Sequence, residues 1–362
     1  MGTLNIPAGV LARAAQVAAG ISSGIDAREV LTGRAALLGL TAQGRVSAGG
    51  ATQLLQGSDG WCALTLSRAD DIAAIPALLE IDAVAEPWPA VHRWVQERTV
   101  AECTDRARLL DLPVAALGEA SATPPRVTPS GTGAGPRLPA GLLVADLTSM
   151  WAGPLCGQLL ARAGAVVVKV ESPGRPDGTR AGNRDFFDWM NAEKLSYVVD
   201  FDRDADALRQ LLAAADVVLE GSRPAALQRR GLGPLDVAAP PGRVWLRITG
   251  YGADADRVAF GDDAAVAGGL VGWDDDGPVF TGDAIADPLT GLEATAAVLA
   301  SLHRGGGEVI DMSMAAVAAK YASAGATTVE PVSPTLPTRA TALGADNAVV
   351  ERLVAERRCA PC

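Results

Sequence analysis

Asp287 is a carboxylate among small and apolar residues, where an Asp side chain gains little stabilisation from packing. It stands in AIADPLTG (284–291), among small and apolar residues, and an alanine-rich run that predicts a helix over 288–303 follows it. An Asp before Pro at a helix start can cap the helix, and a carboxylate can also act as a nucleophile or transfer a proton. The two roles are compatible, because the positive end of the helix dipole would hold the carboxylate ionised.

Basic residues near the ends of two predicted strands could bind an anion. Lys169, Arg175 and Arg180 lie in or after the run AVVVKVE. Arg223 and Arg229 flank a short predicted helix that follows DVVLEG. Ligands of doubly wound sheets bind at the carboxyl ends of the strands, and guanidinium groups match phosphate oxygens in a bidentate geometry. We therefore expect these residues to form a phosphate site as a group, while each Arg taken singly is equally typical of a solvated surface.

The composition restricts the partners of the chain. The formal net charge is −11 and the pI is near 4.8, which argues against a surface for nucleic acid or anionic membranes. No apolar run approaches the roughly 20 residues that span a bilayer, and the first 20 residues lack the regions of a secretory signal. The five Cys residues are scattered and odd in number, which fits a reducing compartment. We expect a cytoplasmic protein that binds neither nucleic acid nor membrane.

A stretch rich in Pro, Gly, Ser and Thr predicts a linker over residues 121–141. It separates a smaller domain, residues 1–120, from a larger α/β domain, residues 142–325. Residues 326–362 form a C-terminal segment. The sequence ends in CAPC, which lacks a second Cys pair to complete a zinc site, so we expect no metal centre.

After the linker, strand and helix signals alternate. Short apolar or β-branched runs predict strands, and helical spacing fills the segments between them. The predicted strands are 142–147, 165–171, 216–221 and 244–252. Repeated β-α-β units of this length predict an α/β fold class, with a doubly wound, mostly parallel, Rossmann-like sheet. Strand and helix signals before the linker indicate a second, smaller α+β domain.

Ordered blocks after the linker carry a family resemblance. The segment LLVADLTSMWAGPLCGQLLARAGAVVVKVESPGRPDGTR resembles the opening of the class III CoA-transferases, the family of formyl-CoA transferase, carnitine CoA-transferase and α-methylacyl-CoA racemase. The resemblance continues in order through NAEKLSYVVD, ADVVLEGSRPAALQRRGLG, RVWLRITGYG, the stretch around Asp287, and EVIDMSM. Several ordered blocks over roughly 170 residues make a far more specific signal than any one of them.

The resemblance implies a function for Asp287. It stands where the family carries its nucleophilic or proton-transferring aspartate. Such a carboxylate can attack an acyl-CoA thioester to give a mixed anhydride, and the CoA thiolate can then form an aspartyl-CoA thioester. The turn containing Trp151 and Ala152 could supply backbone N–H groups for the oxyanions. The resemblance also implies that the five basic residues bind CoA, that acyl-CoA and a carboxylic acid are the substrates, with no permanently bound cofactor, and that the protein is a homodimer.

One departure concerns the racemases of the family, which pair the Asp with a His. Asp262, in FGDDAAVAGG, stands near the place of that His. The chain has two His residues, His92 and His303, and both lie at polar positions of predicted helices. Proton abstraction by an Asp/His pair would lack its His. The transferase interpretation is therefore favoured over the racemase one.

A second departure concerns the order of the blocks. DGWCALTLSRADDIAAIPALLEI and the segment 94–120 resemble family segments that follow the catalytic Asp, yet here they precede it. We therefore interpret the chain as a rearranged or circularly permuted family member, in which residues 1–120 supply the smaller domain. The sequence SAGG (47–50) could then replace the glycine-rich loop that covers the active site, or form a simple turn.

Three other interpretations compete with a catalytic CoA-transferase. The missing His and the rearranged order also fit a non-catalytic or partner-dependent CoA-binding subunit. GISSG matches the nucleophile motif of hydrolases at Ser22, but a predicted helix precedes it where the motif needs a strand. An NAD-dependent enzyme would need a glycine fingerprint after the first strand of the sheet, and TSMWAGP occupies that place.

Overall fold

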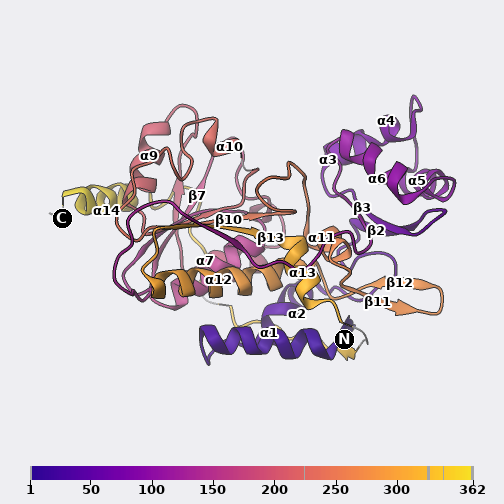
Figure 1. The fold of residues 1–362 in the computed structure, drawn as a ribbon, viewed down its shortest axis with the longest axis horizontal. Helices are drawn as coiled ribbons and strands as arrows, with labels where there is room; N and C mark the ends of the chain where they lie inside the picture. The colour runs from indigo at the N-terminus through magenta and orange to yellow at the C-terminus, as the bar shows by residue number, and fades with distance from the viewer. Residues whose placement is uncertain (1, 224, 324–326, 337, 360–362) are drawn as a thin grey trace.

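A seven-stranded sheet runs through the centre of the molecule (Figure 1). The computed structural model describes residues 2–223, 225–323, 327–336 and 338–359. The strand order is β5-β13-β10-β9-β6-β7-β8; β5 is antiparallel to β13, and the other neighbours are parallel. The strands are β5 (Arg126–Pro129), β6 (Leu143–Leu147), β7 (Val166–Glu171), β8 (Leu195–Val198), β9 (Val217–Glu220), β10 (Val244–Thr249) and β13 (Glu308–Ser313).

The order of the parallel strands determines where a ligand fits. Counted along the chain, they stand in the order 3-2-1-4-5-6, so the order reverses between β6 and β9. In open sheets of this kind the crevice for a ligand lies outside the carboxyl ends of the strands, at that reversal. Two-stranded and three-stranded antiparallel sheets accompany the central one. The predicted α/β fold class, with a large, mostly parallel sheet, is confirmed.

Helices cover both faces of the sheet because successive strand side chains point to opposite faces. Val144 and Val167 belong to one hydrophobic core, and Leu143 and Val168 belong to the other. The first core holds α7 (Ala152–Arg162), α8 (Arg184–Asn191), α11 (Gly261–Ala267), α12 (Ala286–Arg304) and α13 (Met314–Tyr321). The second core holds α9 (Ala205–Ala214), α10 (Ala225–Gln228) and α14 (Asn347–Cys359). None of the described helices is long and apolar enough to cross a membrane.

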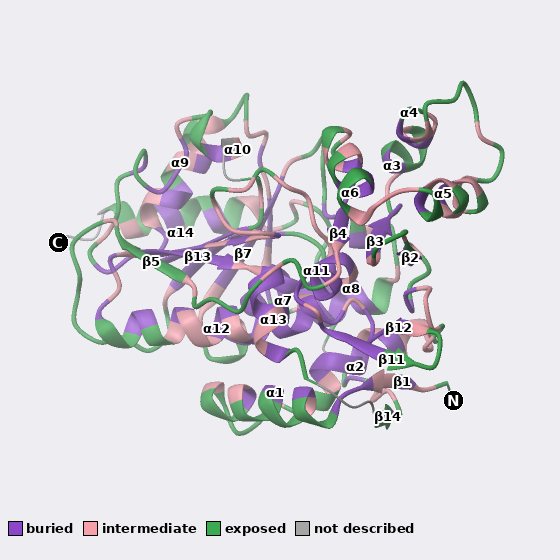
Figure 2. Cartoon of the chain, turned by 45° about the vertical axis from the view of Figure 1, so that its right-hand side comes forward, coloured by how far each residue is buried: buried purple, intermediate pink, exposed green. Residues whose placement is uncertain are grey.

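The first part of the chain packs on the face that carries α12. The helix α1 (Ala8–Ile21) lies beside α12, and α2 (Ala27–Leu38) contacts α8 and α12 (Figures 1 and 2). The strand β1 (Leu4–Ile6) pairs with β14 (Thr327–Val329), which joins the start of the described chain to a segment that follows α13. Their apolar side chains belong to the same core as those of α7 and α12. This packing brings α2 close to the start of α12.

Residues 52–116 form a smaller lobe with a core of its own. Its sheet has the order β2-β3-β4. The elements are β2 (Thr52–Gln56), β3 (Trp61–Thr65), α3 (Ala69–Ala73), α4 (Ile75–Leu79), α5 (Pro87–Gln96), α6 (Val100–Leu109) and β4 (Val114–Ala116). The lobe contacts the hairpin of β11 (Val271–Asp274) and β12 (Gly277–Phe280), and α11, through a small apolar cluster. The domain boundaries at 120 and 141 stay predictions, while the packing joins the first 48 residues to the larger core.

The predicted linker contains an element that its composition did not indicate. Within the stretch 121–141, β5 pairs with β13 at the edge of the central sheet, and all four of its residues are exposed. The segment 87–110 forms two helices, since Thr99 begins the second with a capping box in which Glu102 takes part. The residue types at 121–141 are compatible with a linker, and pairing with β13 decided the conformation of β5.

Candidate active site

Asp287 lies in the first turn of α12 and faces the first turn of α7. The predicted helix over 288–303 is confirmed and begins slightly earlier, at Ala286. Asp287 does not cap it: the N-cap residue is Ile285, and no side chain makes a capping hydrogen bond there. Its carboxylate instead accepts a hydrogen bond from the backbone N–H of Ala152, the first residue of α7. The carboxylate therefore lies where the positive ends of two helices meet.

The backbone around Asp287 is shaped to admit its carboxylate. A Cβ atom built on Gly261, the first residue of α11, would lie 2.3 Å from Asp287 Oδ2 and 2.3 Å from the carbonyl oxygen of Ala284. Any residue other than Gly would thus displace the carboxylate or the turn. Ala284 itself has a φ of 42°, and Met150, two residues before Ala152, has a φ of 74°. Both values lie in the left-handed region that non-glycine residues rarely adopt, and such strain clusters at functional sites.

Further carboxylates and one cation surround Asp287. Asp262 accepts a hydrogen bond of 3.0 Å from the backbone N–H of Ala284. Asp283 is almost fully buried and accepts a hydrogen bond of 2.5 Å from Nη1 of Arg34, a residue of α2. Like Asp287, Asp262 is partly exposed, whereas Asp283 is not. The site therefore presents two partly exposed carboxylates beside an ion pair whose carboxylate, Asp283, is buried.

Burial dominates the acidity of these groups. It raises the pKa of Asp287 to about 7, with Arg34 acting to lower it and Asp262 and Asp283 acting to raise it further. Burial likewise raises the pKa of Asp262 to about 6, and that of Asp263, the next residue of α11, to about 7. Desolvation thus opposes the helix dipole, which by itself would favour the ionised form of Asp287. Carboxyls with a pKa near neutrality are suited to nucleophilic and proton-transfer work.

Arg34 is held by aromatic side chains as well as by Asp283. Its guanidinium carbon lies 5.7 Å from the centroid of the Trp151 ring and 5.6 Å from that of Phe186. Trp151 is almost fully buried, and its ring meets Phe186 edge to face with 5.5 Å between centroids. The ring of Trp151 thus packs against the guanidinium of Arg34, and the next residue, Ala152, contacts Asp287 directly.

The SAGG stretch (47–50) lies against this site. Ser47 donates a hydrogen bond toward Asp262 and accepts one of 3.1 Å from the backbone N–H of Thr52. A Cβ atom built on Gly49 would lie 3.8 Å from Nη2 of Arg34. The stretch forms a turn beside Arg34, and its role as a replacement for the glycine-rich covering loop stays a prediction.

Several buried polar atoms around Asp287 lack a hydrogen-bond partner among the described residues. Buried polar groups are nearly always paired, and exceptions at a site mark places where a ligand or water completes the bonding. These atoms are Trp151 Nε1, Asp263 Oδ2, Thr281 Oγ1, Asp283 Oδ2 and Thr290 Oγ1.

Two of the predicted phosphate-binding residues are engaged inside the protein. Lys169 is 1% exposed, and its ammonium is 2.7 Å from Asp177 Oδ2 and donates to the carbonyl of Thr148. Arg180 forms a bidentate pair with the buried Glu171. Both cations are paired with carboxylates of the protein. Their packing therefore does not support the expectation that they bind phosphate oxygens. They instead fix the loop that follows β7.

The other three predicted residues remain on the surface. Arg175 and Arg229 are exposed. Arg223 is 41% exposed and lies 2.9 Å from Asp111 and 3.8 Å from Asp256. These residues follow β7 and β9, so they border the carboxyl edge of the sheet near the reversal of strand order.

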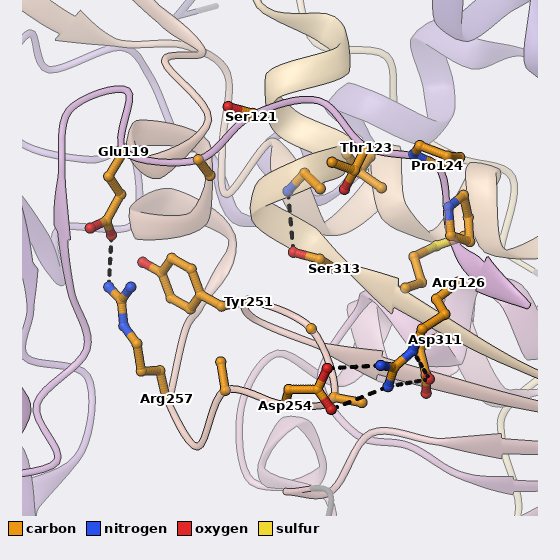
Figure 3. A pocket seen from close by; sticks show the side chains of 18 residues that line it. Glu119, Ser121, Thr123, Pro124, Arg126, Tyr251, Asp254, Arg257, Asp311 and Ser313 are labelled. Atoms are coloured by element: carbon orange, nitrogen blue, oxygen red, sulfur yellow. Dashed lines mark hydrogen bonds and ion pairs between the residues drawn. The ribbon is translucent and has the colours of Figure 1, made fainter.

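A cavity lies elsewhere, at the carboxyl ends of β10 and β13 (Figure 3). Its volume is about 580 Å³, and one wall is made by the stretch before β5. Arg257 pairs with Glu119 on one side, and Arg126 pairs with Asp254 and Asp311 on the other. Each charged side chain that lines the cavity is thus engaged in an ion pair, and none of the residues around Asp287 lines it.

The other residues considered for catalysis or metal binding lie away from Asp287 or outside the described residues. Among the described residues, no group of His, Cys, Asp and Glu could hold a metal ion. His92 bonds to Gln53 in the smaller lobe, and His303 lies in the last turn of α12, opposite the end that carries Asp287. Ser22 is exposed at the end of α1, with a helix before it. The side chains of the C-terminal CAPC lie outside the described residues.

Two residues of the site were missed by sequence reasoning, namely Arg34 and Asp283. Arg34 belongs to an ordinary helical pattern, and nothing near it in the sequence indicates a carboxylate partner 249 residues away. Asp283 follows a Gly and resembles a turn residue. A count of carboxylates near Asp287 would have included Asp283, but no signal pointed to Arg34.

Known proteins resemble the second part of the chain. A succinyl-CoA–D-citramalate CoA-transferase of Chloroflexus aurantiacus is 34% identical over 47% of this chain and 47% of its own. A formyl-CoA:oxalate CoA-transferase of Streptomyces coelicolor is 34% identical over 48% of this chain and 47% of its own. The chain thus spans about half the length of the curated relatives it matches. A solved CaiB/BaiF family protein of Brucella suis is 30% identical, with a TM-score of 0.47 over 51% of this chain and 55% of its own.

The family assignment comes from a match to a family model. The model described as CoA-transferase family III matches residues 140–347, which is more than half of the 362 residues. The matched range contains Asp287, Asp262 and Ala152, whereas Arg34 lies outside it. This chain belongs to CoA-transferase family III.

Proposed function

We propose that the chain is a CoA-transferase that moves CoA from an acyl-CoA to a carboxylic acid, with Asp287 as the nucleophile. The observation that carries the proposal is the placement of Asp287: a partly exposed carboxylate, hydrogen-bonded to the Ala152 N–H where two helices begin. The family assignment supports the reaction type. The names of the relatives, which include succinyl-CoA and formyl-CoA transferases, indicate donors to try first.

The first half of the proposed reaction moves the acyl group to Asp287. A carboxylate oxygen attacks the thioester carbonyl, and the tetrahedral intermediate expels CoA thiolate to leave a mixed anhydride. Backbone N–H groups at the start of α7 would stabilise the oxyanion, since they point at the reacting carbonyl at no cost in reorganisation. A pKa of about 7 leaves Asp287 more basic, and hence more nucleophilic, than an exposed carboxylate.

The second half transfers CoA. The thiolate attacks the aspartyl carbonyl of the anhydride, which releases the donor acid and leaves an aspartyl-CoA thioester. The acceptor carboxylate then attacks that thioester and expels the thiolate, and the thiolate attacks the acyl carbonyl of the new anhydride. This last step releases the product acyl-CoA and regenerates the carboxylate of Asp287.

Binding of CoA is assigned to the exposed basic residues. Arg175, Arg223 and Arg229 border the carboxyl edge of the sheet, and each would meet a phosphate as a partly solvated pair. Lys169 and Arg180 would act indirectly, by holding the loop that carries Arg175. The homodimer and the cytoplasmic location remain predictions.

The rearranged order of blocks is part of the proposal. Residues 1–120 would do the work of the smaller domain that follows the Asp in the usual arrangement. Contacts from this part to the site support it: Arg34 pairs with Asp283, and Thr65 donates a hydrogen bond of 3.0 Å to Asp263. A domain unrelated to the reaction would have no reason to contribute such contacts.

Mass spectrometry of the covalent intermediate tests the proposal. The protein would be mixed with succinyl-CoA, formyl-CoA and a panel of other acyl-CoAs, with and without hydroxylamine, beside Asp287→Ala. We expect a CoA or acyl adduct that maps to Asp287, is cleaved by hydroxylamine and is absent in the variant. A matched control, Asp274→Ala, removes an exposed carboxylate of the β11–β12 hairpin and should leave the adduct in place.

The same experiment separates the alternative interpretation. Because the chain spans about half of its relatives, it could be a CoA-binding subunit that needs a partner chain. CoA binding without an adduct for any donor would favour that subunit and contradict the proposed mechanism. Exchange of the α-proton of an acyl-CoA with solvent, without acyl transfer, would favour a racemase-like isomerase.

A further inference from the structure

Arg34 is the basic side chain that lies among the carboxylates around Asp287. It is outside the range 140–347 that the family model matches. It comes from α2, which packs against α8 and α12. Its Nη1 donates to Asp283 at 2.5 Å, and the rings of Trp151 and Phe186 flank its guanidinium at 5.7 and 5.6 Å. The side chain is 24% exposed, so it is held firmly but is not sealed from the site.

The charged groups that face Asp287 are mostly acidic. Asp262 approaches from α11 and Asp283 from the turn before α12, and both are acidic. The first turn of α7 contributes the Ala152 N–H and no charged side chain. Further along α12, Glu293 is already paired with Lys320 of α13. Arg34 is thus the positive charge that offsets part of the negative charge of this group of carboxylates.

We propose that Arg34 is a positioning residue that keeps Asp287 anionic for the attack on the thioester, so that the N-terminal segment completes the site from within the same chain. This inference rests on the proposed function. Asp283 and the two rings hold the guanidinium in place, because a planar cation can pair at its edge and stack on its faces at once. An ammonium on a flexible stem would keep the charge and lose the stacking.

The inference agrees with the direction in which each neighbouring group changes the pKa of Asp287. Burial raises the pKa of Asp287 to about 7, and Arg34 is the strongest influence that lowers it. Without Arg34 the pKa of Asp287 would rise further, so the anionic form would be lost from the neutral range. An opposite charge at such a site typically moves a pKa by about 1 to 3 units.

Two measurements on one set of variants test the inference. The variants are Arg34→Gln, Arg34→Lys, the double variant Arg34→Gln/Asp283→Asn, and the control Arg45→Gln. The first measurement is the titration midpoint of Asp287 by NMR of protein labelled at the Asp side-chain carbon, with Asp287→Asn identifying the signal. The second is the pH dependence of acyl-adduct formation at Asp287.

We expect Arg34→Gln to raise the midpoint by about 1 pH unit and to slow adduct formation about 10-fold at pH 6.5. Arg34→Lys should restore part of the shift because it keeps the charge. Arg45 is a matched control: it also comes from the N-terminal segment, pairs with Asp274 at 2.9 Å and lies 5.4 Å from the Trp61 ring, but it does not face Asp287. Arg45→Gln should leave both readouts unchanged.

The double variant protects the test against misfolding. Arg34→Gln alone leaves Asp283 buried without its cation, whereas the double variant removes both charges. If Arg34 acts on Asp287, the midpoint stays above the wild-type value, since Arg34 influences Asp287 more strongly than Asp283 does. A midpoint that returns to the wild-type value, or one that never moves in Arg34→Gln, would overturn the inference.

The two proposals can fail separately. If the midpoint moves as expected and no acyl-CoA forms an adduct with the wild-type protein, the charge relation stands and the transferase mechanism falls. If the adduct forms and the midpoint is indifferent to Arg34, the mechanism stands and this inference falls.

Discussion

Two groups of buried charges in this protein differ in their balance. The Asp287 cluster contains four carboxylates and one cation: Arg34, Asp262, Asp263, Asp283 and Asp287. The β6–β7 network contains three carboxylates and three cations: Asp146, Lys169, Glu171, Asp177, Arg180 and Lys194. Both lie near the start of α7, yet one has surplus negative charge and the other has none.

Their acidities differ accordingly. Burial acts to raise the pKa of Asp146 and of Asp177, but neighbouring lysines outweigh it, and the pKa of each is lowered. In the Asp287 cluster burial prevails, and the pKa of Asp287 rises to about 7. A matched network holds a structure in one charge state. An unmatched cluster holds carboxylates near the point at which they gain or lose a proton, as the proposed reaction requires.

Breaking the matched network should have the largest effect. Lys194 donates to Asp146 and to Asn191, at 2.8 and 3.0 Å, and is almost fully buried. Lys194→Met leaves the Asp146 carboxylate buried without its closest cation, so we expect a loss of about 3–5 kcal/mol of stability in urea unfolding. The double variant Lys194→Met/Asp146→Asn should recover part of it. Unchanged stability in the single variant would contradict the structural role.

Crowding the Asp287 carboxylate should reduce activity strongly. In Gly261→Ala the new Cβ meets both Asp287 Oδ2 and the carbonyl oxygen of Ala284, so the carboxylate or its turn must move, and a displacement of about 1 Å in a reacting group can slow a reaction about 100-fold. The readout is the rate of adduct formation at Asp287. Gly174→Ala is the control, since a Cβ there meets nothing within 4 Å. A Gly261 variant as fast as wild type would show that the position of the carboxylate is not limiting.

The pH dependence of stability should distinguish the two groups. The pKa of Asp263 is about 7 in the folded protein, against 3.8 ordinarily, so the folded state keeps a proton between pH 4 and 7 that the unfolded state has released. Stability therefore falls as pH rises through this window, by about 1.4 kcal/mol per pH unit for each such group. Asp263→Asn should flatten the slope measured by denaturant unfolding at a series of pH values.

Asp200→Asn is the control for that measurement. Backbone N–H groups of Arg203 and Asp202 lower the pKa of Asp200, so its contribution to stability changes only in more acidic solution. Its slope between pH 5 and 7 should equal that of the wild type. An Asp263 variant with an unaltered slope would mean that another group releases the proton.

The smallest effect should come from the exposed arginines. Arg229→Gln should weaken CoA binding by no more than about 5-fold, as expected for a solvated ion pair, and the loss should shrink at high salt. Arg180→Gln should instead reduce thermal stability, because it leaves Glu171 buried without its cation. Calorimetric titration with CoA and thermal unfolding separate the two. The opposite assignment of effects would make Arg180 the CoA ligand.

Local patterns were enough to predict the architecture. The run VVVKVE forms β7, and the alanine-rich stretch after Asp287 forms α12, because a short sequence with one clear periodicity has one favourable backbone conformation. The order of these elements predicted the α/β class. The strand β5 was missed because its residues resemble a linker and only the edge of β13 gives them a partner.

The sequence by itself determined the parallel sheet, the helix whose first turn contains Asp287 and the family to which the chain belongs, since all three depend on patterns within short segments. Tertiary structure alone decided that Lys169 is buried in an ion pair, that Arg34 reaches Asp283 across 249 residues, and that Asp287 titrates near pH 7. The physical reason is desolvation: the charge state of a buried group depends on everything that encloses it, and the enclosing residues come from distant parts of the chain.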